Sequence, residues 1–517
     1  MPAPDSAVFD RLRRLVALDD PEARPALDVE TVFTGEPLST MPIGTAEDVA
    51  SAMRKARRAA AAWAATSPKH RAEIIDRYRV LVLRNRDALL DLAQAETGKS
   101  RAAALEDVLA LLMQSRYFAR IAPRLLKPRR VPGMMPGLTK TVVYQQPKGV
   151  VGVISPWNYP MALAIGDAIP ALLAGNAVVL KPDSRTPYCA LANAELLYEA
   201  GLPRELLAIV PGPGSVVGTA IVETCDYLMF TGSSATGRLL AQQCGSRLIG
   251  FSAELGGKNP MIVTAGANLD TVAKAAARAC FANAGQLCLS IERIYVQDSV
   301  ADSFTGKFLD AVAEIRLGAA YDFDTDMGSL ISAAQLAEVS KHVEDARDKG
   351  ATVLAGGRAR PDLGPYFYEP TVLTGVTDDM LCARAETFGP VVSIYPVADA
   401  EAAIAAANDS EYGLNASVWA ATPAAGQAIA ARLHSGIVNV DEGYAPAIGS
   451  LAAPMGGMGS SGIGRRHGPQ GLLKYTEPQT IALQRLLTLD PPPGLSNSRW
   501  QRLLAPVVNA IGALPRS

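Results

Sequence analysis

Apolar residues recur at helical spacing over the early part of the chain. From Ala46 to Ala122 they follow a period of about 3.6 residues, which is typical of amphipathic helices. The pattern predicts one helix from Ala46 through Trp63, a second over the apolar positions that follow Ile74, and a third from Leu105 to Phe118.

Downstream of these helices, short apolar runs alternate with stretches of helical spacing. The short runs predict strands at 139–145, 149–154, 177–180, 207–210 and 227–230. The helical spacing predicts helices at 161–173, 189–200 and 232–244. This alternation is typical of a parallel sheet with helices on both faces.

A second alternating stretch predicts a further α/β domain between about residues 256 and 449. Its predicted strands are 261–263, 293–296 and 391–395. Its predicted helices are 270–284, 300–313, 334–349 and 400–408. Two or more cores are expected in a chain of 517 residues, because that length exceeds one ordinary domain.

Composition excludes several classes of protein. The chain is 49% apolar with a net charge of −2, so it offers no basic stripe for nucleic acid. No apolar run approaches the roughly 20 residues that span a bilayer, and the N-terminus lacks the apolar core of a signal peptide. We therefore expect neither a nucleic-acid partner nor a transmembrane segment.

The cysteines and histidines show no metal-binding pattern. The six cysteines lack a CxxC pair, and there are only four histidines, so no metal is expected. Reduced thiols are the simplest interpretation, and a cytoplasmic location follows from it.

Three separate side chains carry the parts needed to oxidise an aldehyde. The Cys288 thiol, in Gly285-Gln286-Leu287-Cys288, is a candidate nucleophile. The Asn158 amide, in Pro156-Trp157-Asn158-Tyr159-Pro160, can stabilise an oxyanion together with the Cys288 backbone N–H. The carboxylate of Glu254 can activate the water that hydrolyses a thioester.

Each of these residues also has a plain interpretation. A single cysteine is usually a small buried hydrophobic residue, and a single glutamate is usually solvated. Cys280 lies in the apolar stretch Ala279-Cys280-Phe281 and is interpreted as a core residue.

A glycine-bearing turn after a predicted strand suggests a phosphate site. Gly232 and Ser233 would open a helix whose N-terminal N–H groups face a phosphate, with Gly237 further along. The spacing is not G-x-G-x-x-G, so helix-start and packing roles for the two glycines remain an equal alternative.

Six motifs, in order, resemble the aldehyde dehydrogenase superfamily from about Asp28 to Gln484. They are Pro156-Trp157-Asn158-Tyr159-Pro160, Asn176-Ala177-Val178-Val179-Leu180-Lys181-Pro182, Phe230-Thr231-Gly232-Ser233, Glu254-Leu255-Gly256-Gly257-Lys258, Gly285-Gln286-Leu287-Cys288 and Glu386-Thr387-Phe388-Gly389-Pro390. The resemblance implies a Rossmann-like cofactor domain, an α/β catalytic domain and a small bridging β-sheet. It also makes Cys288 the nucleophile, Glu254 the general base and Asn158 an oxyanion donor.

The resemblance implies a domain division and an oligomer. The NAD(P)-binding domain would comprise 1–128 and 148–255, the catalytic domain 256–449, and the bridging segments 129–147 and 450–490. A tail would follow at 491–517, where Trp500, Leu503, Leu504, Val507, Val508 and Ile511 recur near helical spacing. A protruding sheet needs a partner edge, so a homodimer or homotetramer is expected.

The resemblance also implies the cofactor contacts. They are Trp157, Lys181, Pro182, Asp183, Ser184, Gly232, Ser233, Gly237, Leu255, Glu386 and Phe388. Members that prefer NAD often carry Glu where this chain has Ser184. Ser184 cannot repel a 2′-phosphate, and Lys181 can pair with one. NADP is therefore expected, with NAD as the alternative.

Over the whole chain, the resemblance within the superfamily is to NADP-dependent enzymes that oxidise succinate semialdehyde. The alternative is a broad-range aliphatic or aromatic aldehyde dehydrogenase, and the remaining one is a non-catalytic structural member of the fold. Retention of Cys288, Glu254 and Asn158 favours an enzyme that uses water, rather than CoA or phosphate, as the acyl acceptor.

The succinate-semialdehyde enzymes carry an arginine just after the Asn158 motif, whereas this chain has Gly166 and Asp167. They also tend to carry a second cysteine where Ser290 stands.

The remaining candidates for a distal carboxylate are three arginines. Arg465 and Arg466 lie in a divergent loop, and Arg293 is widespread in the family. For the Arg465-Arg466 pair, a solvated or inter-subunit position is the favoured alternative.

Overall fold

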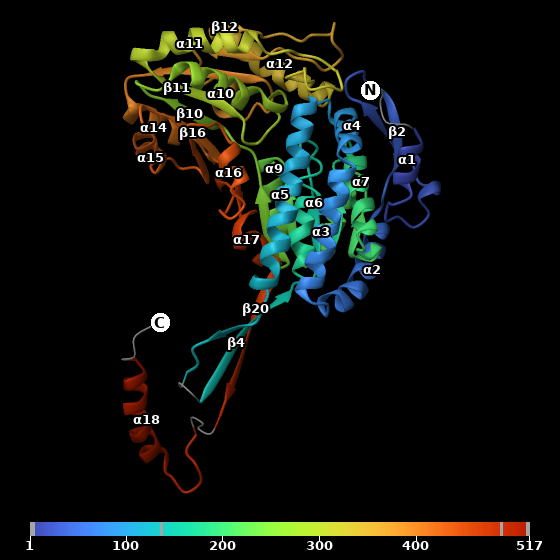
Figure 1. Cartoon of the computed structure of the whole chain (residues 1–517), viewed down its shortest axis with the longest axis vertical. Helices are drawn as coiled ribbons and strands as arrows, with labels where there is room; N and C mark the ends of the chain where they lie inside the picture. The colour runs from blue at the N-terminus through green and yellow to red at the C-terminus, as the bar shows by residue number, and fades with distance from the viewer. Residues whose placement is uncertain (1–5, 135–137, 486–489, 513–517) are drawn as a thin grey trace.

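The computed structural model describes residues 6–134, 138–485 and 490–512. A layer of long helices forms one side of the molecule (Figure 1). These are α2 (Ala46–Ala64), α3 (Pro68–Arg84), α4 (Arg86–Thr97) and α5 (Arg101–Leu125). The three predicted helices correspond to α2, α3 and α5, and α4 is an additional one. It ends at Gly98, which has the left-handed backbone (φ 68°) common after a helix.

A six-stranded sheet forms the centre of the part that follows. Its order is β19-β9-β8-β5-β6-β7, with β19 antiparallel and the rest parallel. The strands are β5 (Val150–Ile154), β6 (Ala177–Lys181), β7 (Leu207–Ile209), β8 (Tyr227–Thr231), β9 (Gly250–Glu254) and β19 (Gly462–Ile463). Its helices include α6 (Ile165–Leu173), α7 (Pro187–Glu199), α8 (Thr219–Thr224) and α9 (Ser234–Ser246). Strands β5 to β8 are buried at nearly every position, as expected for a sheet covered on both faces.

A seven-stranded sheet forms the centre of the second α/β part, in the order β12-β13-β14-β11-β10-β16-β17. The strands are β10 (Asn259–Val263), β11 (Ile291–Gln297), β12 (Thr352–Ala355), β13 (Thr371–Thr374), β14 (Val391–Val397), β16 (Asn415–Trp419) and β17 (Ile437–Val440). Its helices include α10 (Leu269–Phe281), α11 (Asp298–Ala313), α12 (Ala333–Asp348), α14 (Ala400–Asn408) and α15 (Pro423–Ala430). The predicted α/β fold with two such parts is confirmed.

A third, three-stranded sheet projects from the body as an arm (Figure 1). It contains β3 (Arg129–Val131), β4 (Thr139–Pro147) and β20 (Thr476–Gln484), in the order β20-β4-β3. Within the predicted bridging segment 450–490, β20 joins this sheet, whereas β19 pairs with β9 of the six-stranded sheet. Helix α18 (Asn497–Gly512) follows the arm, at the helical spacing that the sequence predicted.

Two predicted helices have different ends in the structure, and the difference shapes the site. The helix predicted from Met161 begins at Ile165, and the Asp107 carboxylate accepts hydrogen bonds from the N–H groups of Met161 and Ala162 in the segment before it. The helix predicted to reach Ala284 ends at Phe281, where a short 3-10 turn takes over.

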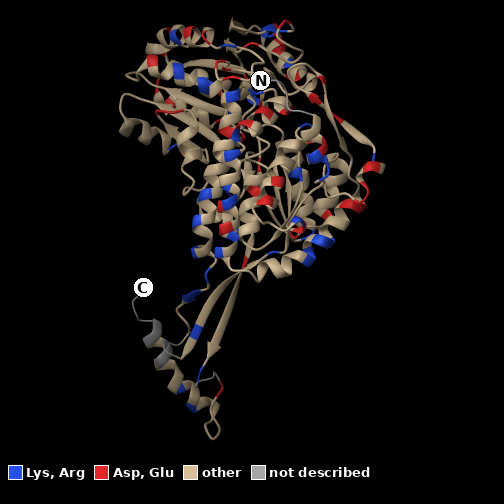
Figure 2. Cartoon of the chain, turned by 45° about the vertical axis from the view of Figure 1, so that its right-hand side comes forward, with Lys and Arg blue, Asp and Glu red and all other residues tan. Residues whose placement is uncertain are grey.

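Charged side chains of both signs are interspersed over the body, and the arm carries few of them (Figure 2). Among the described residues, no helix is long and apolar enough to cross a bilayer. The same residues contain no cluster of three His, Cys, Asp or Glu side chains suited to a metal ion.

Candidate active site

Four parallel strands of the six-stranded sheet end at the same edge, where ligands gather in open α/β sheets. Trp157 and Asn158 follow β5, and the segment from Lys181 to Ser184 begins at the end of β6. Gly232 and Ser233 follow β8, and Glu254 is the last residue of β9. The parallel register places Ile154 beside Lys181 and Thr231 beside Glu254.

The loop that carries Cys288 is built from left-handed backbone. Asn283 (φ 51°), Ala284 (φ 54°) and Gly285 (φ 70°) are consecutive left-handed residues. Such backbone costs a residue with a Cβ about 1–2 kcal/mol, and it is tolerated where a site requires it. A Cβ on Gly285 would lie 2.0 Å from the Gly389 carbonyl oxygen, so only glycine fits there. The Asn259 amide donates to the Cys288 carbonyl at 2.8 Å and fixes the end of the loop.

Cys288 lies where two cavities meet. One cavity, of about 240 Å³, is lined by nine of the predicted site residues: Trp157, Asn158, Gly232, Ser233, Glu254, Leu255, Cys288, Glu386 and Phe388. The other, of about 260 Å³, shares Asn158, Leu163 and Cys288 with it and continues between α5 and the segment 444–455. A thiol at this junction can face a carbonyl compound on one side and a nicotinamide ring on the other.

Cys288 is half-buried, whereas the other five cysteines are fully buried. Burial raises the pKa of the Cys288 thiol to about 12, and the Arg466 charge acts in the opposite direction. Cys280 is 1% exposed inside the apolar core, which confirms the interpretation of that residue.

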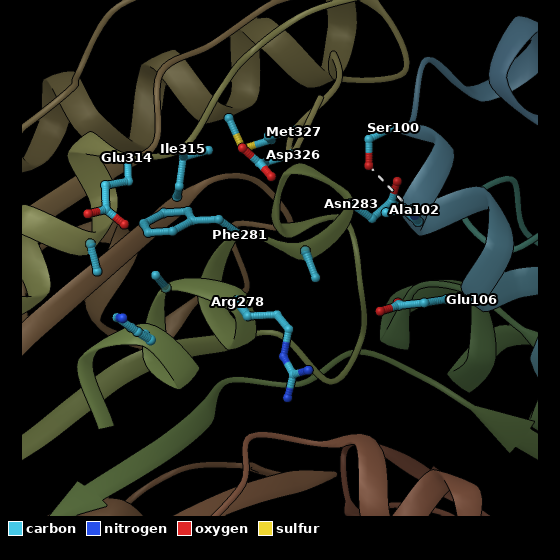
Figure 3. Close-up of a pocket in the computed structure, with 15 residues that line it drawn as sticks. Ser100, Ala102, Glu106, Arg278, Phe281, Asn283, Glu314, Ile315, Asp326 and Met327 are labelled. Atoms are coloured by element: carbon cyan, nitrogen blue, oxygen red, sulfur yellow. Dashed lines mark hydrogen bonds between the residues drawn. The ribbon is translucent and has the colours of Figure 1, made fainter. Parts of the chain in front are cut away.

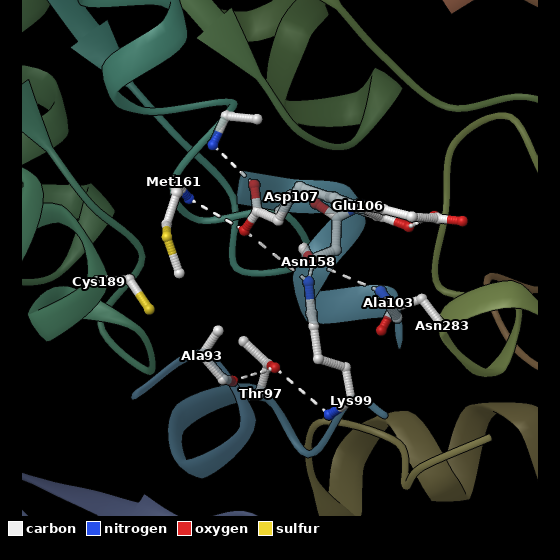
Figure 4. Close-up of polar contacts among 12 residues, drawn as sticks. Ala93, Thr97, Lys99, Ala103, Glu106, Asp107, Asn158, Met161, Cys189 and Asn283 are labelled. Atoms are coloured by element: carbon white, nitrogen blue, oxygen red, sulfur yellow. Dashed lines mark hydrogen bonds and ion pairs between the residues drawn. The ribbon is translucent and has the colours of Figure 1, made fainter. Parts of the chain in front are cut away.

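Asn158 is held both at its side chain and at its main-chain carbonyl, and Figure 4 shows the main-chain end with Lys99. Its side-chain Nδ2 donates to the Gln286 carbonyl at 3.1 Å, two residues before Cys288. Its main-chain carbonyl accepts a hydrogen bond of 2.6 Å from the buried Lys99 Nζ. Lys99 also lies 4.0 Å from Asp107 and over the ring of Tyr159. Lys99 and Asp107 were not among the predicted site residues, since nothing in the local sequence distinguishes them from other charged residues on helices.

Glu254 is buried and lines the same cavity as Cys288. It is 3% exposed, and its Oε2 has no hydrogen-bond partner in the structure. Burial raises its pKa to about 7, with smaller opposing contributions from Arg466 and Lys474. A carboxylate with a pKa near neutrality suits general-base work at physiological pH.

The segment after β6 presents a cation and a hydroxyl. Lys181 is 6% exposed, and its Nζ donates to the Pro182 carbonyl at 2.9 Å. The Ser184 hydroxyl donates to the Gly212 carbonyl at 3.2 Å. The Asp183 carboxylate accepts hydrogen bonds from Arg185 Nε and Nη2, at 2.8 and 3.0 Å. The carboxylate next to Ser184 is therefore neutralised by its neighbour.

Of the remaining predicted cofactor contacts, Glu386 and Phe388 line the smaller of the two cavities at Cys288, whereas Gly237 and the segment from Lys181 to Ser184 do not line it. Glu386 accepts a hydrogen bond from the Gly257 N–H at 2.8 Å, and burial raises its pKa to about 8. Phe388 has a left-handed backbone (φ 52°) and packs edge to face against Trp157, with ring centroids 5.5 Å apart. Gly237 lies further along α9, where a Cβ would come within 2.6 Å of Leu255.

Helix α9 offers the first turn that a phosphate site requires. Ser233 caps it, since its side chain accepts a hydrogen bond from the Thr236 N–H. The N–H groups of the first helical turn have no carbonyl partner within the helix and point toward the strand ends. The chemistry of these residues fits a dinucleotide, since they offer free N–H groups at the start of α9, a cation at Lys181 and aromatic rings at Phe388 and Trp157.

The second cavity is mainly apolar. The apolar residues that line it are Leu109, Ala110, Met113, Tyr159, Ala162, Leu163, Leu287, Leu289, Tyr444, Ala445, Ile448 and Met455. Its polar lining comes from Glu106, Gln114, Asn158, Arg466 and His467. Of these only Asn158 was predicted as a site residue, and Arg466 was weighed as a contact for a substrate carboxylate.

The arginines occupy different places from those expected. Arg466 is neither solvated nor placed at a subunit surface: it is 3% exposed and bound to Asp167. Arg293 is 4% exposed and donates to the carbonyls of Lys258 and Ala407. Arg465 is half-buried and donates to the carbonyls of Gly464 and Gly457. Ser290 is 2% exposed and donates to the Cys280 carbonyl, so it joins the loop of Cys288 to the end of α10.

A third cavity, of about 390 Å³, adjoins the second at Glu106 (Figure 3). Its wall carries Glu106, Arg278, Glu314 and Asp326, so charges of both signs face it. Cys288 does not line it. The chemistry of the candidate residues therefore belongs to the other two cavities.

Two cavities that meet at a cysteine, with an amide and a carboxylate on their walls, are the arrangement of a thiol-dependent oxidoreductase site. Residues 20–481 match the model of the aldehyde dehydrogenase family, and the chain belongs to that family.

The relatives agree. A Mycolicibacterium smegmatis protein with the provisional name succinate-semialdehyde dehydrogenase (NADP+) is 67% identical over 515 residues, which cover all of both chains. A succinate-semialdehyde dehydrogenase structure from Burkholderia pseudomallei shows 35% identity and a TM-score of 0.85, covering 89% of this chain and 95% of that one. An aldehyde dehydrogenase structure from Brucella melitensis shows 32% identity and a TM-score of 0.87, covering 94% of this chain and 100% of that one.

Proposed function

We propose that the protein oxidises succinate semialdehyde to succinate with NADP, through a covalent bond to Cys288. The observation that carries the chemistry is the position of Cys288 and Asn158 on the walls of two cavities, one that also contains Glu254, Glu386 and Phe388 and one that is mainly apolar. The substrate rests on relatives that are 66–67% identical over the full chain and are provisionally named for it.

The Cys288 thiolate adds to the aldehyde carbon, and the carbonyl oxygen becomes an oxyanion. The Asn158 Nδ2 and the Cys288 backbone N–H donate hydrogen bonds to that oxygen. When bound, oxidised NADP supplies the acceptor for the hydride that leaves the same carbon. A thioester remains on Cys288.

Glu254 then removes a proton from water, and the resulting hydroxide adds to the thioester carbon. Collapse of this adduct breaks the C–S bond, so the carboxylic acid leaves and the Cys288 thiolate is restored. Burial of Glu254 supports this role, because its raised pKa makes it a stronger base than an exposed carboxylate.

NADP is proposed over NAD because the segment expected to bind the ribose carries the Lys181 cation and has a hydroxyl, not a carboxylate, at Ser184. Asp183 is next in sequence, but its charge is balanced by Arg185. A 2′-phosphate would meet Lys181 without an unpaired carboxylate beside it.

A second candidate function is the oxidation of neutral aliphatic or aromatic aldehydes. The observation that favours it is the lining of the second cavity, where apolar side chains dominate and the guanidinium of Arg466 is already bound by Asp167. A buried distal carboxylate without a partner is costly, whereas a methyl or phenyl end is not.

A substrate panel separates the two functions. Steady-state rates are measured for succinate semialdehyde, butanal, hexanal and benzaldehyde, each with NADP and with NAD. The proposed function predicts the highest kcat/KM for succinate semialdehyde with NADP. A clear preference for the neutral aldehydes establishes the second candidate instead, and a requirement for CoA contradicts both.

The domain boundaries predicted from the sequence, a homo-oligomeric state and a cytoplasmic location belong to the same proposal. Strands β20 and β3 are the edges of the arm sheet, and Ile481 and Leu483 on β20 are each 50% exposed. An exposed edge with apolar side chains is suited to pairing with another copy of the chain. Sedimentation of the full chain tests the assembly.

A nucleophilic thiol requires a reducing compartment, and the cytoplasm provides one.

A further inference from the structure

A buried ion pair lies directly behind the residues assigned to the chemistry. The Arg466 guanidinium donates from Nε to Asp167 Oδ1 at 2.8 Å and from Nη2 to Oδ2 at 2.9 Å. Both side chains are at most 4% exposed. The same Nη2 donates to the Thr231 hydroxyl at 2.7 Å. Three hydrogen bonds therefore hold the guanidinium in one orientation.

Main-chain contacts place this guanidinium close to Glu254. Thr231, which accepts its third hydrogen bond, is the register partner of Glu254 in adjoining parallel strands. On the other side of Glu254, Gly462 pairs with it, four residues before Arg466. A Cβ on Gly456 would lie 2.9 Å from Glu254 Oε1, so the loop between Gly456 and Arg466 encloses the carboxylate. Arg466 also lines the cavity that contains Cys288.

A buried ion pair is weak evidence for stability, because desolvation offsets most of the attraction. This ion pair, however, lies near Cys288 and Glu254, which must both be anionic during the reaction, so it affects their protonation. The structure assigns Arg466 as a positioning residue, whose fixed positive charge stabilises the Cys288 thiolate and the Glu254 carboxylate. The Asp167 carboxylate partly offsets that charge and so limits the stabilisation. This inference rests on the roles proposed above for Cys288 and Glu254.

The surrounding charges agree with the assignment. The groups that act on Glu254 are Arg466 and Lys474, which lower its pKa, Asp167, which raises it, and Arg465, which lowers it. Those that act on Cys288 are Arg466, which lowers the thiol pKa, and Glu254 and Glu386, which raise it.

Arg466 differs from Lys474, another cation that acts on Glu254. Burial lowers the Lys474 pKa to about 8, so that side chain loses its charge in mildly alkaline solution. The arginine remains charged at every pH at which the protein works. It is therefore the constant element of the field around both anions.

The test compares Arg466→Gln, Asp167→Asn, Arg466→Lys and the double variant Asp167→Asn/Arg466→Gln in the full-length protein. The first readout is the rate of Cys288 alkylation by iodoacetamide at one fixed pH, with the modified peptide identified by mass. Raising a thiol pKa by one unit slows alkylation by only about three- to fourfold, because the thiolate that does form is more nucleophilic. The second readout is the acidic limb of the kcat profile.

Opposite signs are the expected result. Arg466→Gln slows alkylation at least threefold and moves the acidic limb of kcat up by about one pH unit, since an opposite charge nearby lowers a pKa by about 1–3 units. Asp167→Asn speeds alkylation and moves that limb down, because the guanidinium loses its counter-charge. Arg466→Lys restores most of the wild-type behaviour, because it keeps the charge.

The double variant covers the case in which a single change leaves an unpaired buried group and the protein fails to fold. It replaces both charged side chains with neutral amides, and its alkylation rate should lie between those of wild type and Arg466→Gln. A folded double variant that is alkylated at the wild-type rate overturns the assignment. The assignment is also overturned when Arg466→Gln and Asp167→Asn shift the alkylation rate, or the acidic limb of kcat, in the same direction as each other. Alkylation at Cys288 that leaves dehydrogenase turnover intact would instead refute the proposed function.

Discussion

Lys99 and Asn158 are joined by a hydrogen bond of 2.6 Å, from the lysine Nζ to the main-chain carbonyl of the asparagine. Lys99 is 1% exposed and Asn158 is 3% exposed, so the contact is sealed from solvent. The Asn158 side chain is thereby held toward the loop of Cys288, where its Nδ2 reaches the Gln286 carbonyl. An oxyanion donor is effective when it is pre-oriented, and Lys99 provides that orientation.

Replacing Lys99 with Met should destabilise the protein and slow turnover. The change leaves the Asn158 carbonyl with only the longer hydrogen bond from Asn283 Nδ2, at 3.4 Å. It also leaves the Asp107 carboxylate buried without its cation, which typically costs about 3–5 kcal/mol. Guanidinium unfolding measures the stability. The matched control is Lys99→Met with Asp107→Asn, which removes both charges and should recover part of the loss. Equal stabilities for the wild type and the single variant contradict the contact.

Cys288→Ala should abolish dehydrogenase turnover and leave cofactor binding intact. The thiol is the half-buried one among the six cysteines, and it lies where the two cavities join. Quenching of Trp157 fluorescence by NADP reports binding, since Trp157 lines the cofactor cavity. Cys280→Ala, in the core, is the control and should retain activity. Turnover of Cys288→Ala within about tenfold of wild type, a barrier change of only about 1.4 kcal/mol, would exclude the nucleophile assignment.

Glu254→Gln should slow thioester hydrolysis more than hydride transfer. A pre-steady-state burst of reduced cofactor is expected to survive in this variant, while the steady-state rate falls. Stopped-flow absorbance at the reduced-nicotinamide band measures both phases. An unchanged steady-state rate contradicts the general-base role.

The same carboxylate sets a pH dependence. Its pKa is raised to about 7, and the base acts only when ionised, so the hydrolysis rate should fall about tenfold per unit below that pH. The fall should disappear in Glu254→Gln, because the amide does not titrate in this range. A kcat profile over the acidic range, taken with a substrate whose burst shows that hydrolysis limits turnover, provides the measurement.

Ser184→Glu should shift the coenzyme preference from NADP toward NAD. A carboxylate near the 2′-phosphate is a like-charge contact, which can cost on the order of several kcal/mol. The ratio of kcat/KM values for the two coenzymes measures the effect. Ser184→Gln matches the length without the charge, so the two variants separate repulsion from bulk. Equal shifts in both variants would show that charge is not the cause.

The chain by itself determined the kind of fold and the main chemistry. Strand and helix periodicities predicted the α/β alternation, because each element carries its own pattern of buried positions. Short motifs made three residues identifiable, namely Cys288, Glu254 and Asn158. The glycines and prolines of each motif impose a particular local backbone conformation. Gly285 is an example, since the positive φ and the close approach of Gly389 exclude every larger residue.

Only the tertiary structure decided what surrounds those groups. Asp167 and Arg466 are 299 residues apart and were considered separately. Asp167 was noted near the place where succinate-semialdehyde enzymes carry an arginine, and Arg466 was noted as a possible contact for a substrate carboxylate. Folding pairs them, because burying either charge alone would be costly. Lys99 reaches Asn158 across 59 residues for the same reason, since a buried ammonium must find an acceptor. Such pairings depend on which elements pack together, and no local sequence pattern predicts that packing.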